Sequence, residues 1–273
     1  MKKIFLTATI LFCTISAGCL QGGSNLIITD GGEVFMQNRL IGVPLVAEAI
    51  ENFRQSFEQR GGAEISPVAE NNMSGYEIRV HYPSIENFAA EGNPMFLSRA
   101  GKCKGIQLKR GWFFDAYNFD LIFTGGERKY SELEAATVQS MLSQVTFDLV
   151  MELPYAADVH NADKFDADKK FLTWHLAPVL IGSLADKKMH AQFKIWHREK
   201  IFLTALVGII FFAATIFFAV KTRAEESESL AKDLAFKRNV FGGIFVTLMI
   251  ISAAMLFAPI TFTDAEIISA AAP

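Results

Sequence analysis

An uncharged stretch at residues 201–220 constrains the fold of this chain more than any other feature. It holds 20 residues without a charge, and 13 of them are Ile, Leu, Val or Phe. A helix of this length spans a hydrocarbon core of ~30 Å. On scales of membrane insertion, so many apolar residues favour transfer into the bilayer by about 4–8 kcal/mol. We therefore predict a transmembrane helix over residues 201–220.

A second uncharged stretch at residues 240–263 predicts another transmembrane helix, so the two form a hairpin. The segment 221–239 between them carries five basic residues, whereas the tail 264–273 carries none. Basic residues are retained on the cytoplasmic side, so we expect a cytoplasmic loop at 221–239 and a short extracytoplasmic tail at 264–273. Acid–base pairs at helical spacing predict that the loop is largely helical.

The start of the chain is typical of a secretion signal. Lys2 and Lys3 precede an apolar run over residues 4–17, and such a run is too short to span a bilayer comfortably. The signal ends in Ser16-Ala17-Gly18-Cys19, which resembles the lipobox of bacterial lipoproteins, whose cysteine is acylated. We expect residues 1–18 to be a signal peptide, Cys19 to carry a palmitate-type lipid, and residues 19–200 to form an extracytoplasmic domain. The alternative is ordinary signal cleavage that leaves Cys19 as an unmodified thiol.

Cysteine usage indicates that this domain is stabilised by its core. Cys13 would leave with the signal and Cys19 would be acylated, so only Cys103 remains. One free cysteine cannot form an intramolecular disulfide. A redox role for Cys103 between two lysines is an alternative that lacks a resolving cysteine.

Residues 20–200 alternate between strand-type and helix-type hydrophobic patterns. An amphipathic helix begins at Pro44, and the capping box of Ser131 and Glu134 starts a second one that runs through Val145. Strands are expected over 25–29, 33–42, 76–82, 106–108, 112–124, 147–153, 171–176 and 189–196. We predict an α+β fold: a curved, mostly antiparallel sheet with two principal amphipathic helices on one face, followed by the two-helix transmembrane hairpin.

Charge and motifs argue against several classes of function. The formal net charge of −3 is not that of a nucleic-acid-binding protein, which normally presents a strongly basic face. The chain has no Gly-x-Ser-x-Gly elbow, phosphate loop, dinucleotide fingerprint or Cys-x-x-Cys pair. We therefore expect a protein that is not an enzyme, has no catalytic residues and needs no cofactor. An enzyme is the third alternative, and it would need a polar cleft with converging titratable groups.

One cluster has metal-type side chains: Asp158, His160, Asn161, Asp163, Asp166 and Asp168. Calcium sites in loops use several such oxygens, but they also need a glycine for the sharp turn, and none is present here. A solvated turn between two strands explains the same residues. We expect the turn rather than a metal site.

The aromatic content supports a different hypothesis. The chain contains 25 Phe residues, and several fall on the apolar faces of the expected strands and helices. A curved sheet covered by helices can enclose an apolar groove for an acyl chain, although each of these residues is individually more typical of an ordinary core. The candidate groove residues are Phe53, Phe57, Tyr76, Ile78, Val80, Phe119, Leu121, Phe147 and Leu149.

Short motifs in the same order as the expected strands point to a family. Besides the lipobox they are the stretches 111–115 (Gly-Trp-Phe-Phe-Asp), 152–154 (Glu-Leu-Pro), 161–163 (Asn-Ala-Asp) and 172–174 (Leu-Thr-Trp). Together with the following span, over about residues 15–220, they resemble the LppM-like bacterial lipoproteins. That resemblance implies an α/β domain tethered to the membrane, similar to lipid-binding modules of the synaptotagmin-like mitochondrial type. The second span departs from the simplest layout of that family.

Our leading hypothesis from the sequence is an envelope lipoprotein in the bacterial cell membrane whose outside domain binds or transfers a lipid-like ligand. The expected partner is a membrane lipid rather than a nucleic acid. The alternative is a non-catalytic scaffold or assembly factor with a membrane-protein partner. The sequence does not define the oligomeric state.

Overall fold

The computed structural model describes residues 20–58, 62–90, 105–124, 145–180, 186–262 and 266–267. These divide into two compact units. The first, called here the sheet domain, covers the described residues of 20–108, 117–195 and 266–267; the second, called the hairpin unit, covers 109–116 and 196–262. The signal peptide, Cys19, Cys103 and the capping box at Ser131 lie outside the described residues.

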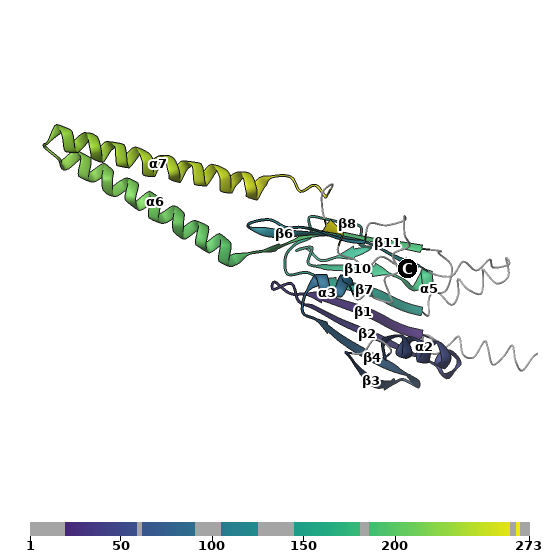
Figure 1. Cartoon of the computed structure of the whole chain (residues 1–273). Helices are drawn as coiled ribbons and strands as arrows, with labels where there is room; N and C mark the ends of the chain where they lie inside the picture. The colour runs from purple at the N-terminus through teal and green to yellow at the C-terminus, as the bar shows by residue number, and fades with distance from the viewer. Residues whose placement is uncertain are drawn as a thin grey trace, which may run out of the picture. The chain divides into compact units, whose positions relative to one another are not determined.

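The sheet domain contains two sheets (Figure 1). The seven-stranded sheet has the order β3-β4-β2-β1-β7-β10-β9, and the five-stranded sheet has the order β12-β5-β6-β11-β8. The strands are β1 (Leu20–Ile28), β2 (Val34–Gly42), β3 (Ala63–Glu70), β4 (Met73–Tyr82), β5 (Gly105–Lys109), β6 (Phe114–Thr124), β7 (Val145–Glu152), β8 (Val159–His160), β9 (Lys164–Phe165), β10 (Phe171–His175), β11 (Asp186–Trp196) and β12 (Glu266–Ile267). The helices of this domain are η1 (Pro44–Val46), α2 (Ala47–Glu58), α3 (Ile85–Ala90) and α5 (Ala177–Leu180).

Strand pairing confirms the predicted α+β class and its mostly antiparallel character. β1–β2, β2–β4, β3–β4 and β7–β10 are antiparallel, whereas β1 and β7 are parallel. A parallel pair needs a long crossover, and here the chain between the two strands contains β2, β3 and β4 of the same sheet and β5 and β6 of the other. The strands are distributed over two sheets, which is a division that hydrophobic alternation alone does not predict.

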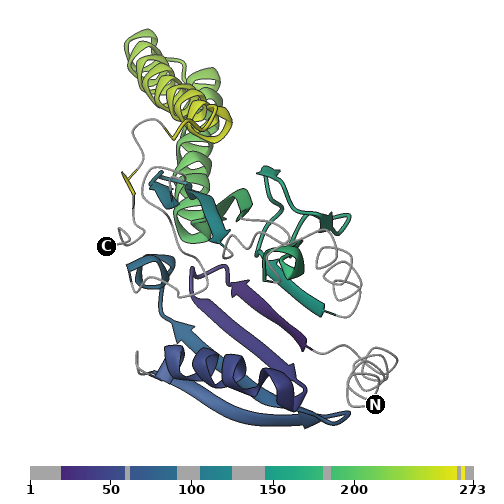
Figure 2. The ribbon, with the colours of Figure 1, turned by 90° about the vertical axis from the view of Figure 1, so that its right-hand side faces the viewer.

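Of the two amphipathic helices expected in this domain, the one that begins at Pro44 is found, and the one expected from Ser131 lies outside the described residues. Pro44 begins η1, which leads into α2, and α2 lies across β2 and β4 (Figure 2). Ile50 and Phe57 of α2 are buried, as an amphipathic helix on a sheet requires. The Ser84 side chain accepts a hydrogen bond of 3.1 Å from the Asn87 backbone N–H and so caps α3.

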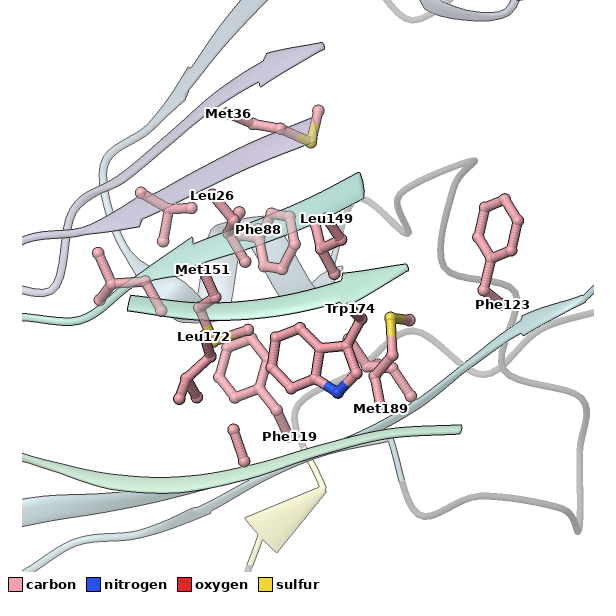
Figure 3. Packing of buried hydrophobic residues seen from close by; sticks show 14 of the residues in the cluster. Leu26, Met36, Phe88, Phe119, Phe123, Leu149, Met151, Leu172, Trp174 and Met189 are labelled. Carbon is pink, nitrogen blue, oxygen red and sulfur yellow. The ribbon is translucent and has the colours of Figure 1, made fainter. Parts of the chain in front are cut away.

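The core lies between the two sheets (Figure 3). Leu26, Leu149 and Trp174 from the seven-stranded sheet face Phe119 and Met189 from the five-stranded sheet, and all are buried. Aromatic contacts tie the layers together: the Phe119 ring lies 6.5 Å from Phe88 of α3 and 5.4 Å from Phe193 of β11.

Several details of the predicted elements are wrong, and the short strands β8, β9 and β12 and the helix α5 were not expected. Strand β3 was not expected, because its sequence is mostly polar and contains Pro67. Proline is tolerated there since β3 is the edge strand of its sheet. Val145, expected on a helical stripe, instead begins β7 and is buried.

The hairpin unit contains two long antiparallel helices that lie side by side (Figure 1), α6 (Arg198–Ala224) and α7 (Glu228–Phe257). Both are long and apolar enough to cross a membrane, judged by length and composition, and almost none of their apolar residues are buried. The predicted helical character of the linker is confirmed: Glu228–Lys232 and Asp233–Lys237 form ion pairs of 2.7 Å within α7.

Small residues allow the two helices to pack closely. A Cβ atom on Gly208 would lie 3.6 Å from Leu248, and one on Gly242 would lie 3.4 Å from Thr215. Gly243, by contrast, has nothing within 4 Å of the corresponding position. Small residues at helix contacts are the usual means of helix association in lipid.

Candidate functional site

The nine candidate groove residues all belong to one core. Phe57, Ile78, Phe119, Leu121, Phe147 and Leu149 are buried in it, and Phe53, Tyr76 and Val80 are partly buried against it. The structure therefore brings them together across α2, both sheets and their interface. That they line a ligand groove stays a prediction.

The register of the seven-stranded sheet places two polar residues in the middle of this apolar face. Ile78 on β4 is paired with Asn38 on β2, Asn38 with Ser24 on β1, and Ser24 with Leu149 on β7. Trp174 on β10 continues the same row next to Leu149. Side chains of paired residues share one face of a sheet, so this row points into the core.

Ser24 and Asn38 are buried without hydrogen-bond partners. Both side chains are 0% exposed, and neither Ser24 Oγ nor Asn38 Oδ1 and Nδ2 has a partner among the described residues. A buried polar group left unsatisfied costs about 1–3 kcal/mol. Such groups are rare enough in folded proteins that each requires an explanation, such as a bound molecule. We call Ser24 and Asn38 the buried polar pair.

The chemistry of the buried polar pair fits a polar group on an apolar molecule. The Asn38 amide has donors on Nδ2 and an acceptor on Oδ1, and the Ser24 hydroxyl is both donor and acceptor. Hydroxyl, ester and amide groups all match these positions. The adjacent rows of the same face are apolar: Leu26 pairs with Met36, and Met36 with Val80. The face as a whole therefore suits a molecule with little polarity and one or two hydrogen-bonding groups.

The buried polar pair was missed from the sequence, although a signal is present. In β2 the inward positions are Val34, Met36, Asn38 and Leu40, so Asn38 interrupts an apolar alternation. Ser24 interrupts the corresponding positions of β1. Only the pairing register shows that the two interruptions are neighbours.

Tyr76, one of the candidate groove residues, is held at the surface edge of the core by α2. Its hydroxyl donates a hydrogen bond of 3.4 Å to Glu51, and the Arg54 guanidinium lies 5.6 Å from its ring centre. Hydrogen bonds from Arg54, and then from Gln55, lower the pKa of Glu51 to about 2. These contacts orient the Tyr76 ring while keeping its hydroxyl outside the apolar face.

The Asp- and Asn-rich cluster at residues 158–168 spans β8, β9, the connection between them and the start of the turn to β10. Asn161 Oδ1 accepts hydrogen bonds from Trp174 Nε1 at 2.9 Å and from the His190 backbone N–H at 2.7 Å. Its Nδ2 donates to the Lys188 carbonyl at 3.1 Å. Asn161 thus satisfies the one polar atom of the fully buried Trp174 and joins three segments.

The carboxylates of this cluster are also used internally. Asp163 accepts hydrogen bonds from the His175 backbone N–H at 2.8 Å and from Lys187 Nζ at 2.7 Å. Asp166 Oδ1 accepts from the backbone N–H groups of Lys170 and Phe171 at 2.7 and 3.0 Å. Within the described part of the chain, no group of three or more His, Cys, Asp or Glu side chains is arranged to hold a metal ion. The expected solvated turn accounts for these residues.

These contacts shift several pKa values in the cluster. Burial alone would raise the pKa of Asp163, but the bonds from Lys187 and His175 outweigh it, so the pKa is lowered. The Phe171 and Lys170 backbone bonds lower the pKa of Asp166. Burial, with the nearby charge of Lys169, lowers the pKa of His160. These lowered pKa values favour charged Asp163 and Asp166 and neutral His160 at neutral pH. In these protonation states the cluster is a structural connection.

Comparison with known proteins adds one structural likeness. No protein-family model matches the chain, and no curated protein matches it. Among solved structures, it is similar to the folded domain of the LppM protein of Mycobacterium tuberculosis, determined by NMR, with a TM-score of 0.38 and 13% identity over 68% of this chain and 95% of that one. This is a weak structural relation to an LppM-like fold. It assigns no function to this chain.

Proposed function

We propose that the chain is an LppM-like envelope lipoprotein, anchored by an acylated Cys19 and by α6 and α7, whose sheet domain binds a lipid-like ligand outside the cytoplasm. The two apolar helices provide the physical basis for the membrane anchor. A ligand of this kind has a long apolar part and a small polar part, and the sheet domain offers surroundings of both types.

The buried polar pair is the observation that supports ligand binding. Leaving Ser24 and Asn38 unsatisfied in an apolar core costs stability, whereas an apolar face without them would be more stable. Residues that destabilise the empty protein are typical of binding sites, where a ligand satisfies them. The candidate groove residues Ile78 and Leu149 flank the pair in the same row.

The test is lipid photocrosslinking in membranes with the full chain and its Asn38→Leu variant. A lipid analogue with a photoreactive acyl chain is activated, and its adducts are mapped by peptide mass spectrometry. We expect adducts on β1, β2 and β7 in the wild type and roughly tenfold fewer in Asn38→Leu, since loss of a hydrogen-bonded polar contact is worth about 1–3 kcal/mol. The same substitution should raise the free energy of unfolding of the ligand-free protein by about 1–3 kcal/mol.

Two controls accompany this experiment. Met36→Leu replaces a neighbouring inward side chain of β2 with another apolar one, so the number of lipid adducts should match that of the wild type. Adducts on α6 and α7 measure contact with membrane lipid outside the sheet domain and should be equal in all variants. If wild-type adducts are confined to α6 and α7, the sheet domain does not bind lipid and the proposal is wrong.

A second candidate function, a scaffold for a membrane-protein complex, is favoured by exposed apolar side chains. Val159, Phe165 and Phe171 are 49%, 56% and 44% exposed around the connection between β8, β9 and β10. Exposed apolar groups close together are typical of protein contacts. Replacing all three with Ser should abolish crosslinking to a protein partner while leaving lipid adducts unchanged. If no protein crosslink forms in the wild type, this alternative is excluded.

A further inference from the structure

An apolar cavity lies within the hairpin unit, between α6 and α7. Its volume is about 530 Å³, within the range of pockets for small ligands. Part of its lining consists of small residues, Ala205 and Gly208 on α6 and Ser252 and Ala253 on α7. Larger apolar side chains form its walls, including Ile209, Phe212, Phe245 and Leu248. We call this cavity the hairpin groove.

The hairpin groove adjoins a smaller cavity of different character. The second cavity, of about 270 Å³, is lined by residues 109–114 and by the segment that follows α7, including Pro259. Phe113 lines both cavities. Its backbone carbonyl accepts a hydrogen bond of 2.8 Å from the His197 N–H, immediately before α6. The connection between β5 and β6 is thus packed against the ends of both helices within this unit.

Basic and aromatic side chains surround the smaller cavity. Lys109 Nζ donates to the Thr261 carbonyl at 3.0 Å. The Lys200 ammonium lies 5.6 Å from the centre of the Trp112 ring, and Trp112 Nε1 donates to Thr204 Oγ1 at 3.3 Å. Trp112 is nonetheless 52% exposed. Exposed tryptophan beside lysine at the end of an apolar helix is the arrangement found at a bilayer surface.

We propose that the two cavities together bind one membrane lipid with an anionic, phosphate-bearing headgroup. Its acyl chain occupies the hairpin groove, and its phosphate lies beside Lys109, Arg110 and Lys200. This inference rests on the membrane placement of α6 and α7 in the proposed function, but it concerns a different site from the buried polar pair.

Charge complementarity selects this occupant. Residues 109–116 and 196–201 contain four basic residues and two acidic ones, and one of the acidic residues, Asp115, lies 3.3 Å from His197. Lys109 and Arg110 line the smaller cavity and Lys200 lies beside Trp112, which also lines it, so the basic side chains match an anionic headgroup above an acyl chain. A zwitterionic lipid fills the same groove but lacks the net charge that these side chains attract.

The experiment is native mass spectrometry of the full chain in equal amounts of phosphatidylglycerol and phosphatidylcholine with identical acyl chains. We expect the wild type to retain phosphatidylglycerol about tenfold better. The triple variant Lys109→Gln, Arg110→Gln, Lys200→Gln should lose this preference. The matched control Lys221→Gln, Lys232→Gln, Lys237→Gln removes as much charge at the opposite end of the helices and should keep it.

A groove-filling pair tests the acyl-chain site. Ala205→Phe places a ring in the hairpin groove and should reduce retention of both lipids, whereas Ala213→Phe on an exposed part of α6 should not.

Equal retention of the two lipids by the wild type overturns the proposal, as does equal loss of preference in both charge variants. A disulfide between two copies carrying Ala205→Cys would assign the groove to a second chain and also overturns it. Adducts on β1 and β2 report on the sheet domain, so failure here leaves the proposed function separately testable.

Discussion

Hydrogen bonds from single side chains hold residues 158–168 in place, and Asn161 makes several of them. Its three hydrogen bonds reach Trp174, His190 and Lys188. Asn161→Ala should lower the free energy of unfolding by about 2–4 kcal/mol, since it also leaves the indole N–H of a buried Trp174 without a partner. Urea unfolding of the two proteins measures this difference.

The control for that prediction is Asn25→Ala. Asn25 is exposed on β1, so its replacement should change the free energy of unfolding by about 0.5 kcal/mol or less. Equal effects of the two substitutions would show that the Asn161 hydrogen bonds contribute little.

The lowered pKa of His160 predicts a dependence of stability on pH. Since its pKa in the folded protein is below its ordinary value of 6.5, the unfolded chain binds the proton more strongly. The stabilisation is present above pH 6.5 and is lost as the pH falls. The lowered pKa values of Asp163 and Asp166 add a loss of the same sign below their ordinary value of 3.8.

The measurement is the free energy of unfolding from pH 8 to pH 3 for the wild type and His160→Gln. The variant should lose the decline that begins near pH 6.5 and keep the one below 3.8. Identical profiles above pH 4.5 would contradict the lowered pKa of His160.

For single residues, the sequence predicted the kind of local structure better than it predicted which residues are in contact. The cluster at 158–168 was expected to be a turn between two strands, because Asp and Asn favour turns through local hydrogen bonds, but the segment also contains the short strands β8 and β9. The partners of Asn161 could not be predicted, because Trp174 and His190 reach it only through the sheet pairing. Ser24 and Asn38 were overlooked for the same reason: each alone is an ordinary polar residue, and only their register makes them a site.

Among the strands, the contact between β2 and β4 depends on a glycine. A Cβ atom on Gly75 would lie 1.9 Å from the Leu40 carbonyl oxygen, a distance at which the two strands must separate. Gly75→Ala should therefore lower the free energy of unfolding by about 3 kcal/mol, measured by urea unfolding. Gly31→Ala, in the turn between β1 and β2, meets only the Thr29 hydroxyl at 3.7 Å and should have a much smaller effect. If the two variants unfold alike, close packing at Gly75 is not limiting.

Elements with strong periodicity were predicted well, and those placed by tertiary context were not. Strand β4 and helix α2 have clear alternating and helical patterns, and both are found where expected. Strand β3 has only a weak pattern, because it is an edge strand whose inward residues Ala63 and Ile65 are only partly buried against the core. Val145 was assigned to a helix since its spacing fits either element, and the parallel pairing with β1 decided for the strand.

For the whole molecule, the sequence is most informative about where the chain resides. The uncharged stretches at 201–220 and 240–263 lie within or overlap α6 and α7, and they determine the proposed anchor through length and composition alone. The separation of the remaining strands into two sheets with a core between them could not be predicted, because it depends on pairings distant in sequence. Both proposed lipid sites depend on this membrane anchor. The anchor also determines on which side of the membrane the sheet domain lies.

The most direct measurement is the accessibility of single cysteines to a membrane-impermeant thiol reagent in intact cells, with Cys103 replaced by Ser. Glu64→Cys reports on the sheet domain and Lys232→Cys on the start of α7, next to the turn from α6; both positions are exposed. We predict that Glu64→Cys is labelled before lysis and Lys232→Cys only after it. Labelling of both from the same side would contradict the anchored arrangement on which the proposed function rests.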